Sequence, residues 1–123
     1  MPKLGKLQKL STDELVALFI DVSLEMKRAD DWLENGAYNR AYDKLDKVMA
    51  ELQVRSGDGR YALLPLLTHP NIQVRLNAAV ATLTLSAVAT EAMQGIASLG
   101  YCSQAFSAKR MLRAIEEGTW KPT

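Results

Sequence analysis

The feature that most restricts the fold of this chain is a helix-capping signal followed by a long amphipathic pattern. Ser11 and Glu14 stand three residues apart, so each side chain can accept a hydrogen bond from the other residue's free backbone amide. After this signal, apolar side chains recur at spacings of three, four and seven residues: Leu15, Leu18, Phe19, Val22, Met26, Ala29 and Leu33. The pattern predicts a helix over residues 12–33, ended by Asn35-Gly36.

A second amphipathic stripe predicts the next helix. Its apolar face consists of Tyr38, Tyr42, Leu45, Val48, Met49 and Leu52. The helix is expected to stop at residues 56–59, where two glycines supply a turn. We interpret Tyr38 and Tyr42 as members of the core rather than as a platform for stacking a ligand.

The rest of the chain predicts four further helices, over residues 60–67, 72–86, 87–99 and 103–117. Pro65 makes the first of these irregular, because proline lacks a backbone donor. No run alternates polar and apolar residues at strand length, so we expect an all-α fold of about six helices, stacked as antiparallel hairpins. Between Leu76 and Ala108 the only charged residue is Glu91, which places the helix at 72–86 in the centre.

Length and charge indicate one globular domain. The chain has 123 residues and a net charge of +1, so its overall charge attracts neither nucleic acid nor membrane. We expect a basic N-terminal arm over residues 1–10, a single helical domain over residues 11–118 and a C-terminal tail over residues 119–123. Trp120 in the tail either packs back onto the domain or binds a partner, and we favour packing.

One stretch of the sequence resembles a HEAT-type helical repeat. The residues that carry the resemblance are Leu63, Leu66, Leu67, Pro70, Val74, Arg75, Ala78, Ala79 and Leu83. The whole chain also resembles a family of small bacterial HEAT-like proteins catalogued only as a domain of unknown function. The resemblance implies a repeat over about residues 60–86 and a HEAT-like or armadillo-like superhelix, and it implies no activity.

Within this repeat, three residues are predicted to be structural. Arg75 follows Val74 at the start of a helix, where its guanidinium can reach carbonyls of the preceding loop or the carboxylate of Asp58. Ala78 and Ala79 are small enough to let two helices pack closely.

Residue types that support catalysis or metal binding are sparse. His69 is the only histidine and Cys102 the only cysteine, so a nucleophile with a base, or a metal cluster, has few residues to draw on. Gly57-Asp58-Gly59 lacks the rest of a phosphate-loop motif. We therefore expect no catalytic residue, no cofactor and no metal. The single cysteine and the absence of a long apolar run predict a reduced, cytoplasmic protein without a membrane span.

Two surfaces are candidates for binding a partner. Val16, Ile20 and Leu24 form a second apolar stripe on the first helix, to be covered by the N-terminal arm or, as we favour, by the same helix of a second copy. The second helix carries a basic face: Arg40, Lys44, Lys47 and Arg55. Glu51 lies among these cations and weakens the face. We expect a non-enzymatic module for protein interaction or assembly; the alternative is a nucleic-acid-binding protein that uses this basic face and Arg60.

Overall fold

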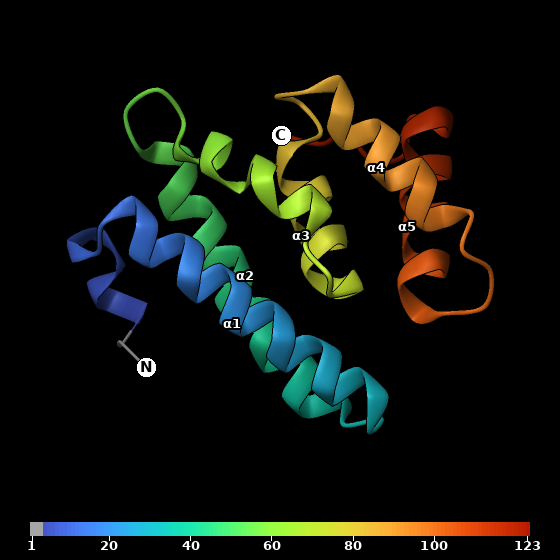
Figure 1. The fold of residues 1–123 in the computed structure, drawn as a ribbon, viewed down its shortest axis with the longest axis horizontal. Coiled ribbons are helices and arrows are strands. Elements are labelled where there is room, and N and C mark those ends of the chain that lie inside the picture. Colours follow the sequence, from blue (N-terminus) through green and yellow to red (C-terminus); the bar gives the residue numbers. More distant parts are fainter. Residues whose placement is uncertain (1–3) are drawn as a thin grey trace. The chain divides into compact units, whose positions relative to one another are not determined.

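The computed structural model describes residues 4–123 and contains only helices, which confirms the all-α prediction. The elements, in chain order, are η1 (Leu4–Lys9), α1 (Thr12–Asp31), α2 (Asn35–Val54), η2 (Gly59–Thr68), α3 (Ile72–Thr82), α4 (Ala87–Ala97) and α5 (Ser103–Glu117) (Figure 1). The two η segments are 3₁₀ helices and the other five are α-helices. Residues 1–3 of the expected basic arm lie outside the described residues.

The chain divides into two compact units, an N-terminal unit that ends at Ala62 and a C-terminal unit that starts at Leu63. The division falls inside η2, and therefore inside the repeat predicted over residues 60–86. Pro65 lies within η2, and the 3₁₀ form of this segment agrees with the irregular helix expected around a proline.

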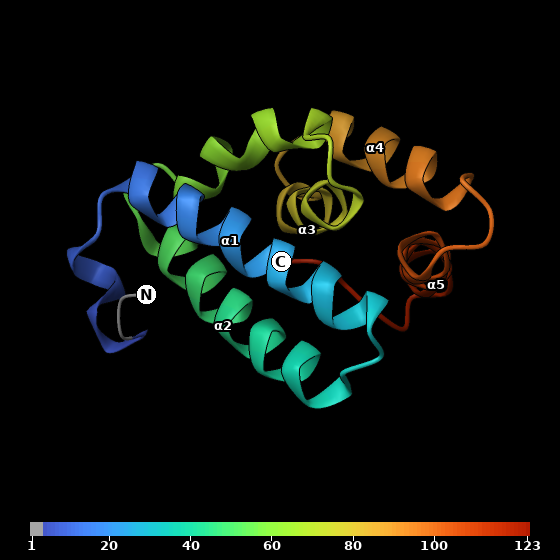
Figure 2. The same cartoon turned by 60° about the horizontal axis from the view of Figure 1, so that its bottom comes forward.

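The N-terminal unit is built on the α1–α2 hairpin, whose two helices lie side by side (Figure 2). The predicted capping box is present, because Ser11 Oγ accepts a hydrogen bond from the Glu14 amide and Glu14 Oε1 accepts one from the Ser11 amide, both at 3.0 Å. These bonds also hold the pKa of Glu14 below its ordinary value. The hairpin core is formed by Leu15, Leu18, Phe19, Val22, Met26, Ala29, Ala41, Leu45, Val48 and Leu52.

The turn of the hairpin differs from the prediction. Helix α1 ends at Asp31, and Asn35 and Gly36 open α2 instead of closing α1. The reason is Leu33, which adopts a left-handed φ of 56°. With Leu33 in this conformation, the Glu34 amide donates to the carbonyl of Ala29 at 2.9 Å and the helix closes before the Asn-Gly signal is reached.

The tyrosines of α2 also differ from the prediction. The buried face of α2 consists of Ala41, Leu45, Val48 and Leu52, while Tyr42 remains 43% exposed. Tyr38 lies next to it, with ring centroids 6.5 Å apart. Leu45, Val48 and Leu52 of the expected stripe are buried, but in the first half of α2 the small Ala41 takes the buried position and the tyrosines lie at the margin of the face.

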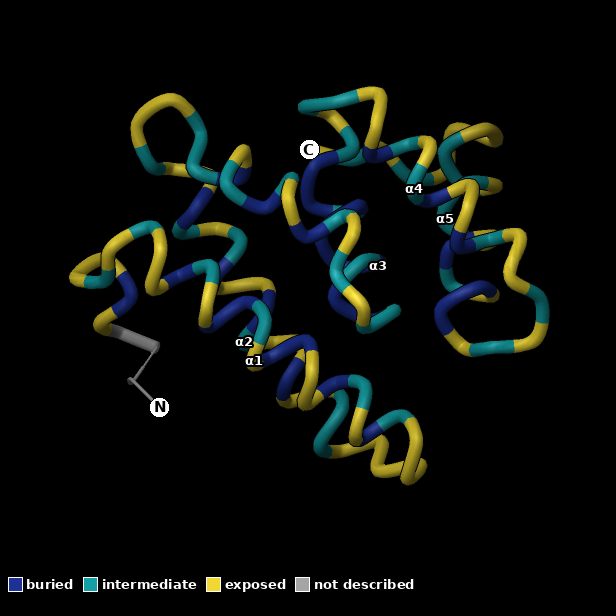
Figure 3. Tube along the Cα trace, viewed as in Figure 1, coloured by how far each residue is buried: buried dark blue, intermediate teal, exposed yellow. Residues whose placement is uncertain are grey.

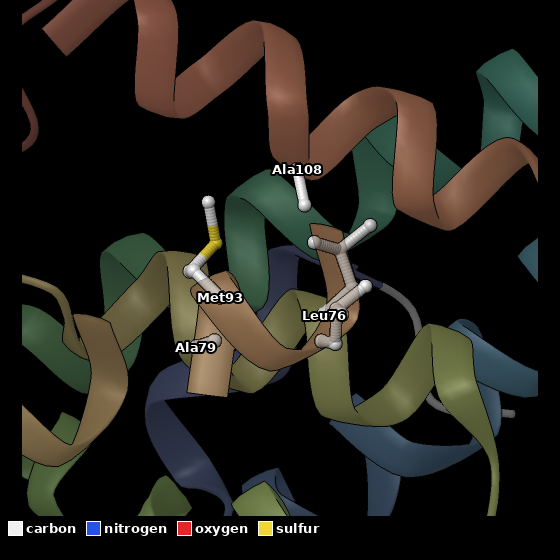
Figure 4. Packing of buried hydrophobic residues seen from close by; sticks show 5 residues of the cluster. Leu76, Ala79, Met93 and Ala108 are labelled. Carbon is white, nitrogen blue, oxygen red and sulfur yellow. The ribbon is translucent and has the colours of Figure 1, made fainter. Parts of the chain in front are cut away.

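The C-terminal unit packs α3 against both α4 and α5, and most residues of α3 are buried (Figure 3). Its apolar core is the cluster of Leu76, Ala79, Met93, Ile96 and Ala108, drawn in Figure 4. Within this unit, α3 holds the central position expected from the scarcity of charge after Arg75.

A buried polar network crosses the same unit. Gln73 Nε2 donates to Asn77 Oδ1 at 2.9 Å along α3, and Gln104 Nε2 donates to Gln73 Oε1 at 3.0 Å from the first turn of α5. All three side chains are buried. The network fixes which face of α5 meets α3, because an unpaired buried amide is costly.

Two helices of this unit are shorter than predicted. Helix α3 ends at Thr82 rather than at residue 86, because the amides of Leu85 and Ser86 both donate to the Thr82 carbonyl. Ser86 then caps α4, accepting a hydrogen bond from the Val88 amide at 3.2 Å. Helix α4 ends at Ala97 rather than at Leu99.

Candidate functional site

A groove lies between the two helices of the hairpin in the N-terminal unit. It has a volume of about 280 Å³ and is lined by Asp21, Val22 and Glu25 of α1 and by Ala37, Arg40, Ala41 and Lys44 of α2. We call this cavity the α1–α2 groove. The buried Val22 and Ala41 and the half-buried Ala37 form an apolar floor, while the charged side chains form the walls.

The acidic and basic side chains of the groove lie on different helices. Both acids, Asp21 and Glu25, lie one helical turn apart on α1, and both bases, Arg40 and Lys44, lie one turn apart on α2. The pKa of Glu25 is lowered, first by hydrogen bonds from Arg28 and further by the positive charges of Lys44 and Arg40. The two walls therefore attract each other across the groove.

Only one of the four charged groups is held by a close partner among residues 4–123. Arg28 donates to Glu25 Oε1 at 2.8 Å and to Glu34 Oε2 at 2.7 Å, so Glu25 belongs to a surface triad. Asp21, Arg40 and Lys44 form no ion pair or side-chain hydrogen bond with another described residue. These three groups are available to a binding partner.

The predicted basic face is not brought together as one free surface. Arg55 donates to Glu51 Oε2 at 2.9 Å and to the backbone carbonyl of Leu7 at 3.1 Å, so it anchors η1 onto α2. Lys47 is exposed and lines a separate cavity beside Leu7. Only Arg40 and Lys44 share the groove. Arg60, offered as a further nucleic-acid contact, is 5% exposed and bound to Asp58.

The predicted apolar stripe on α1 is partly covered. Val16 and Ile20 are half-buried, and Leu24 is 40% exposed. The N-terminal arm offers Leu7 to α2, where this side chain is only 4% exposed. Leu24 is thus the most exposed residue of the stripe.

The structure places the predicted structural residues as follows. Arg75 Nη1 donates to the carbonyls of His69 at 2.9 Å and Pro70 at 3.1 Å, which are the loop carbonyls expected as its partners. Asp58, the alternative partner, instead binds Arg60. Ala78 and Ala79 are fully buried.

The tail and the single histidine both serve local structure. Trp120 is half-buried, its amide donates to the Ala114 carbonyl, and it lines a small cavity on α5 with Met111. His69 Nδ1 accepts a hydrogen bond from the Asn71 amide at 3.0 Å, so this ring nitrogen is engaged in the turn before α3.

Sequence reasoning missed the acidic wall of the groove. Asp21 and Glu25 were not selected, although their i, i+4 spacing matches that of Arg40 and Lys44 on the next helix. This matched spacing was the available signal. Within residues 4–123 there is no cluster of three or more potential metal ligands. In the same part of the chain, no helix combines the length and hydrophobicity needed to cross a bilayer.

Comparisons with known proteins identify the family. A search of curated protein sequences gives no match. The chain is similar to the protein RPA1889 from Rhodopseudomonas palustris CGA009, known from a crystal structure, with 38% sequence identity and a TM-score of 0.90 over 95% of this chain and 98% of that one. Residues 13–116 match the family model described as "Domain of unknown function (DUF2019)". The chain therefore belongs to this family of unknown function, as its resemblance to such a family indicated.

Proposed function

We propose that this chain is a non-enzymatic helical module that binds a protein partner through its α1–α2 hairpin. The observation that carries the proposal is the α1–α2 groove, where Asp21, Arg40 and Lys44 surround an apolar floor. None of these three side chains has an ion-pair partner among the described residues. Charged groups around a small apolar centre are typical of surfaces that recognise proteins. The HEAT-like repeat expected over residues 60–86 supports the same class, because repeat-type helices present long binding surfaces.

The chemistry of the groove favours binding over catalysis. A general acid or base works best when its pKa lies near the working pH. Glu25 does not meet this condition, because hydrogen bonds from Arg28 lower its pKa and so move it further from neutral pH. His69 lies in the other unit and uses Nδ1 within its own turn.

A homodimer through α1 remains part of the proposal. Leu24 is the exposed member of the stripe that also contains Val16 and Ile20, and a second copy would remove it from water. Replacing Ile20 by Asp would place a charge in this stripe, so weaker association of the variant would locate the contact there.

The alternative, nucleic-acid binding through α2, has weaker support. Arg55 is engaged by Glu51 and Leu7, and the two cations of the groove face two acids. Binding through phosphates would weaken steeply with salt. A gel-shift series at rising salt tests this alternative, which requires retention of nucleic acid at low salt.

Site-specific photocrosslinking in cells tests the proposed function. A photoreactive residue replaces Ala37 inside the groove, and the matched control carries it at Glu117, an exposed position on α5. We expect discrete protein adducts from position 37 that disappear when Arg40 and Lys44 are both changed to Glu. Absence of protein adducts at position 37, or the same adducts from both positions, contradicts the proposal.

A further inference from the structure

The four charged side chains of the α1–α2 groove have a net charge of zero, but the two signs lie on opposite walls. Asp21 and Glu25 line one side, and Arg40 and Lys44 line the other. A purely anionic ligand would be attracted by α2 and repelled by α1, and a cationic ligand would meet the reverse. The partner that fits best carries charges of both signs, with its positive groups facing α1 and its negative groups facing α2.

A second copy of the chain carries this order by symmetry. When two hairpins face each other across a two-fold axis parallel to their helices, α1 of each copy lies opposite α2 of the other. Asp21 and Glu25 then face Arg40 and Lys44 of the second copy, and the same contact occurs twice. In both helices the charges are four residues apart, a rise of about 6 Å, so the two rows match in length.

The floor of the groove suits a close approach of helices. It consists of Val22, Ala37 and Ala41, and the two alanines add little bulk above the backbone of α2. Small side chains at a contact let helix axes come within about 8–10 Å. Two such hairpins would form a four-helix bundle with charged pairs at both edges of an apolar seam.

We propose that the α1–α2 groove is the interface between two copies of this chain, arranged with α1 of each copy against α2 of the other. The inference rests on the proposed function, since it names the partner that the hairpin binds. It differs from the dimer through the Leu24 stripe, because its contacts come from both helices and are set by charge.

A charge-exchange experiment tests this arrangement. One variant carries Asp21→Lys and Glu25→Lys, and the other carries Arg40→Glu and Lys44→Glu. Each variant alone brings like charges together at both edges, so sedimentation velocity should show self-association weakened by at least about tenfold relative to the native chain. Mixed in equal amounts, the two variants should form a dimer, because one edge then has native pairs and the other has exchanged pairs.

The controls separate charge from folding. Lys109→Glu with Arg113→Glu makes the same change of net charge as Arg40→Glu with Lys44→Glu, at the same spacing on α5 outside the hairpin, and should leave the dimer intact. Circular dichroism identifies any variant that fails to fold. Two milder variants, Asp21→Lys alone and Lys44→Glu alone, repeat the exchange with one charge per wall. Both leave Glu25 and its bond to Arg28 in place.

Three results would overturn the inference. They are a native chain that is monomeric at tens of micromolar, a dimer that persists in either folded variant, and a mixture of folded variants that does not associate. If the native chain is monomeric while a crosslinker at position 37 traps a different protein, the inference fails and the proposed function stands. If no protein is trapped there either, both fail.

Discussion

Gln104 Nε2 donates a hydrogen bond to Gln73 Oε1 at 3.0 Å and so joins the start of α5 to α3 through two buried side chains. Gln73 in turn donates to Asn77, so three amides form a continuous path. An apolar cluster alone tolerates small shifts of one helix along another, whereas this path has one register in which its donors and acceptors meet.

Replacement of Gln104 by Leu should destabilise the protein. The variant leaves Gln73 Oε1 without this donor inside the core, which costs about 1–3 kcal/mol. Chemical unfolding measures the loss, and Gln94→Leu on the exposed surface of α4 is the matched control. Equal stability of the two variants would mean that the network contributes nothing net.

Leu33→Gly should stabilise the protein. Leu33 ends α1 at φ 56°, and Gly118 ends α5 at φ 76° with the same pattern of backbone hydrogen bonds. A leucine in this region carries strain that glycine avoids, so we expect a gain of about 0.5–1 kcal/mol from Leu33→Gly. Gly118→Leu should show a loss, although the added Cβ meets no atom within 4 Å beyond its neighbours in the chain. Thermal melting of the two variants checks the opposite signs.

Asp58→Asn should flatten the acid limb of the stability curve. Hydrogen bonds from Arg60 lower the pKa of Asp58 from its ordinary 3.8. A carboxylate with a lowered pKa contributes its full stability above that ordinary value and loses it as the pH falls through the folded value. Urea unfolding at pH 7, 4 and 3 should therefore show a steeper decline for the native chain than for the variant. Parallel declines would assign the acid sensitivity to other groups.

Ala79→Leu should overpack the C-terminal unit. Ala79 is fully buried in the cluster with Met93 and Ala108, and added methylenes in such a core cost about 1–3 kcal/mol. Ala17→Leu, at an exposed position of α1, provides the control. A neutral result at position 79 would mean that α3 and α4 can move apart without loss.

Arg75→Ala should lower stability without changing association of the hairpin. The guanidinium donates to two loop carbonyls, and their loss costs about 1–3 kcal/mol where those groups are shielded from water. Unfolding and sedimentation of the same sample separate the two effects. Unchanged melting together with loss of binding would make Arg75 a functional residue instead.

Local sequence signals predicted the ends of helices correctly where a capping residue determines them. The start of α1 follows from Ser11 and Glu14, and α5 has the predicted bounds because Gly118 ends it. The hairpin turn was misplaced because Leu33 adopts a conformation that its residue type disfavours. The start of α4 was predicted, but the end of α3 was placed too late because Ser86, interpreted as the last residue of α3, caps α4 instead.

The site was harder to predict because it depends on the register between two helices. Arg40 and Lys44 are recognisable on α2 alone, but Asp21 and Glu25 become their neighbours only when the hairpin closes. Likewise the pair of Arg55 with Glu51 is visible at i, i+4, whereas the bond from Arg55 to Leu7 joins residues 48 positions apart. The pattern of residues along a single sequence does not show which residues so far apart come into contact.

The bonds from Arg75 have an evolutionary consequence. Its two acceptors are backbone carbonyls, which every amino acid has, so the side chains at positions 69 and 70 do not take part in the contact. Substitutions in this loop can accumulate while the arginine keeps its partners, provided that they preserve the backbone path, which His69 Nδ1 supports by accepting a hydrogen bond from the Asn71 amide. A loop of this kind can take on new surface chemistry in a descendant protein without any compensating change in the helix that follows it.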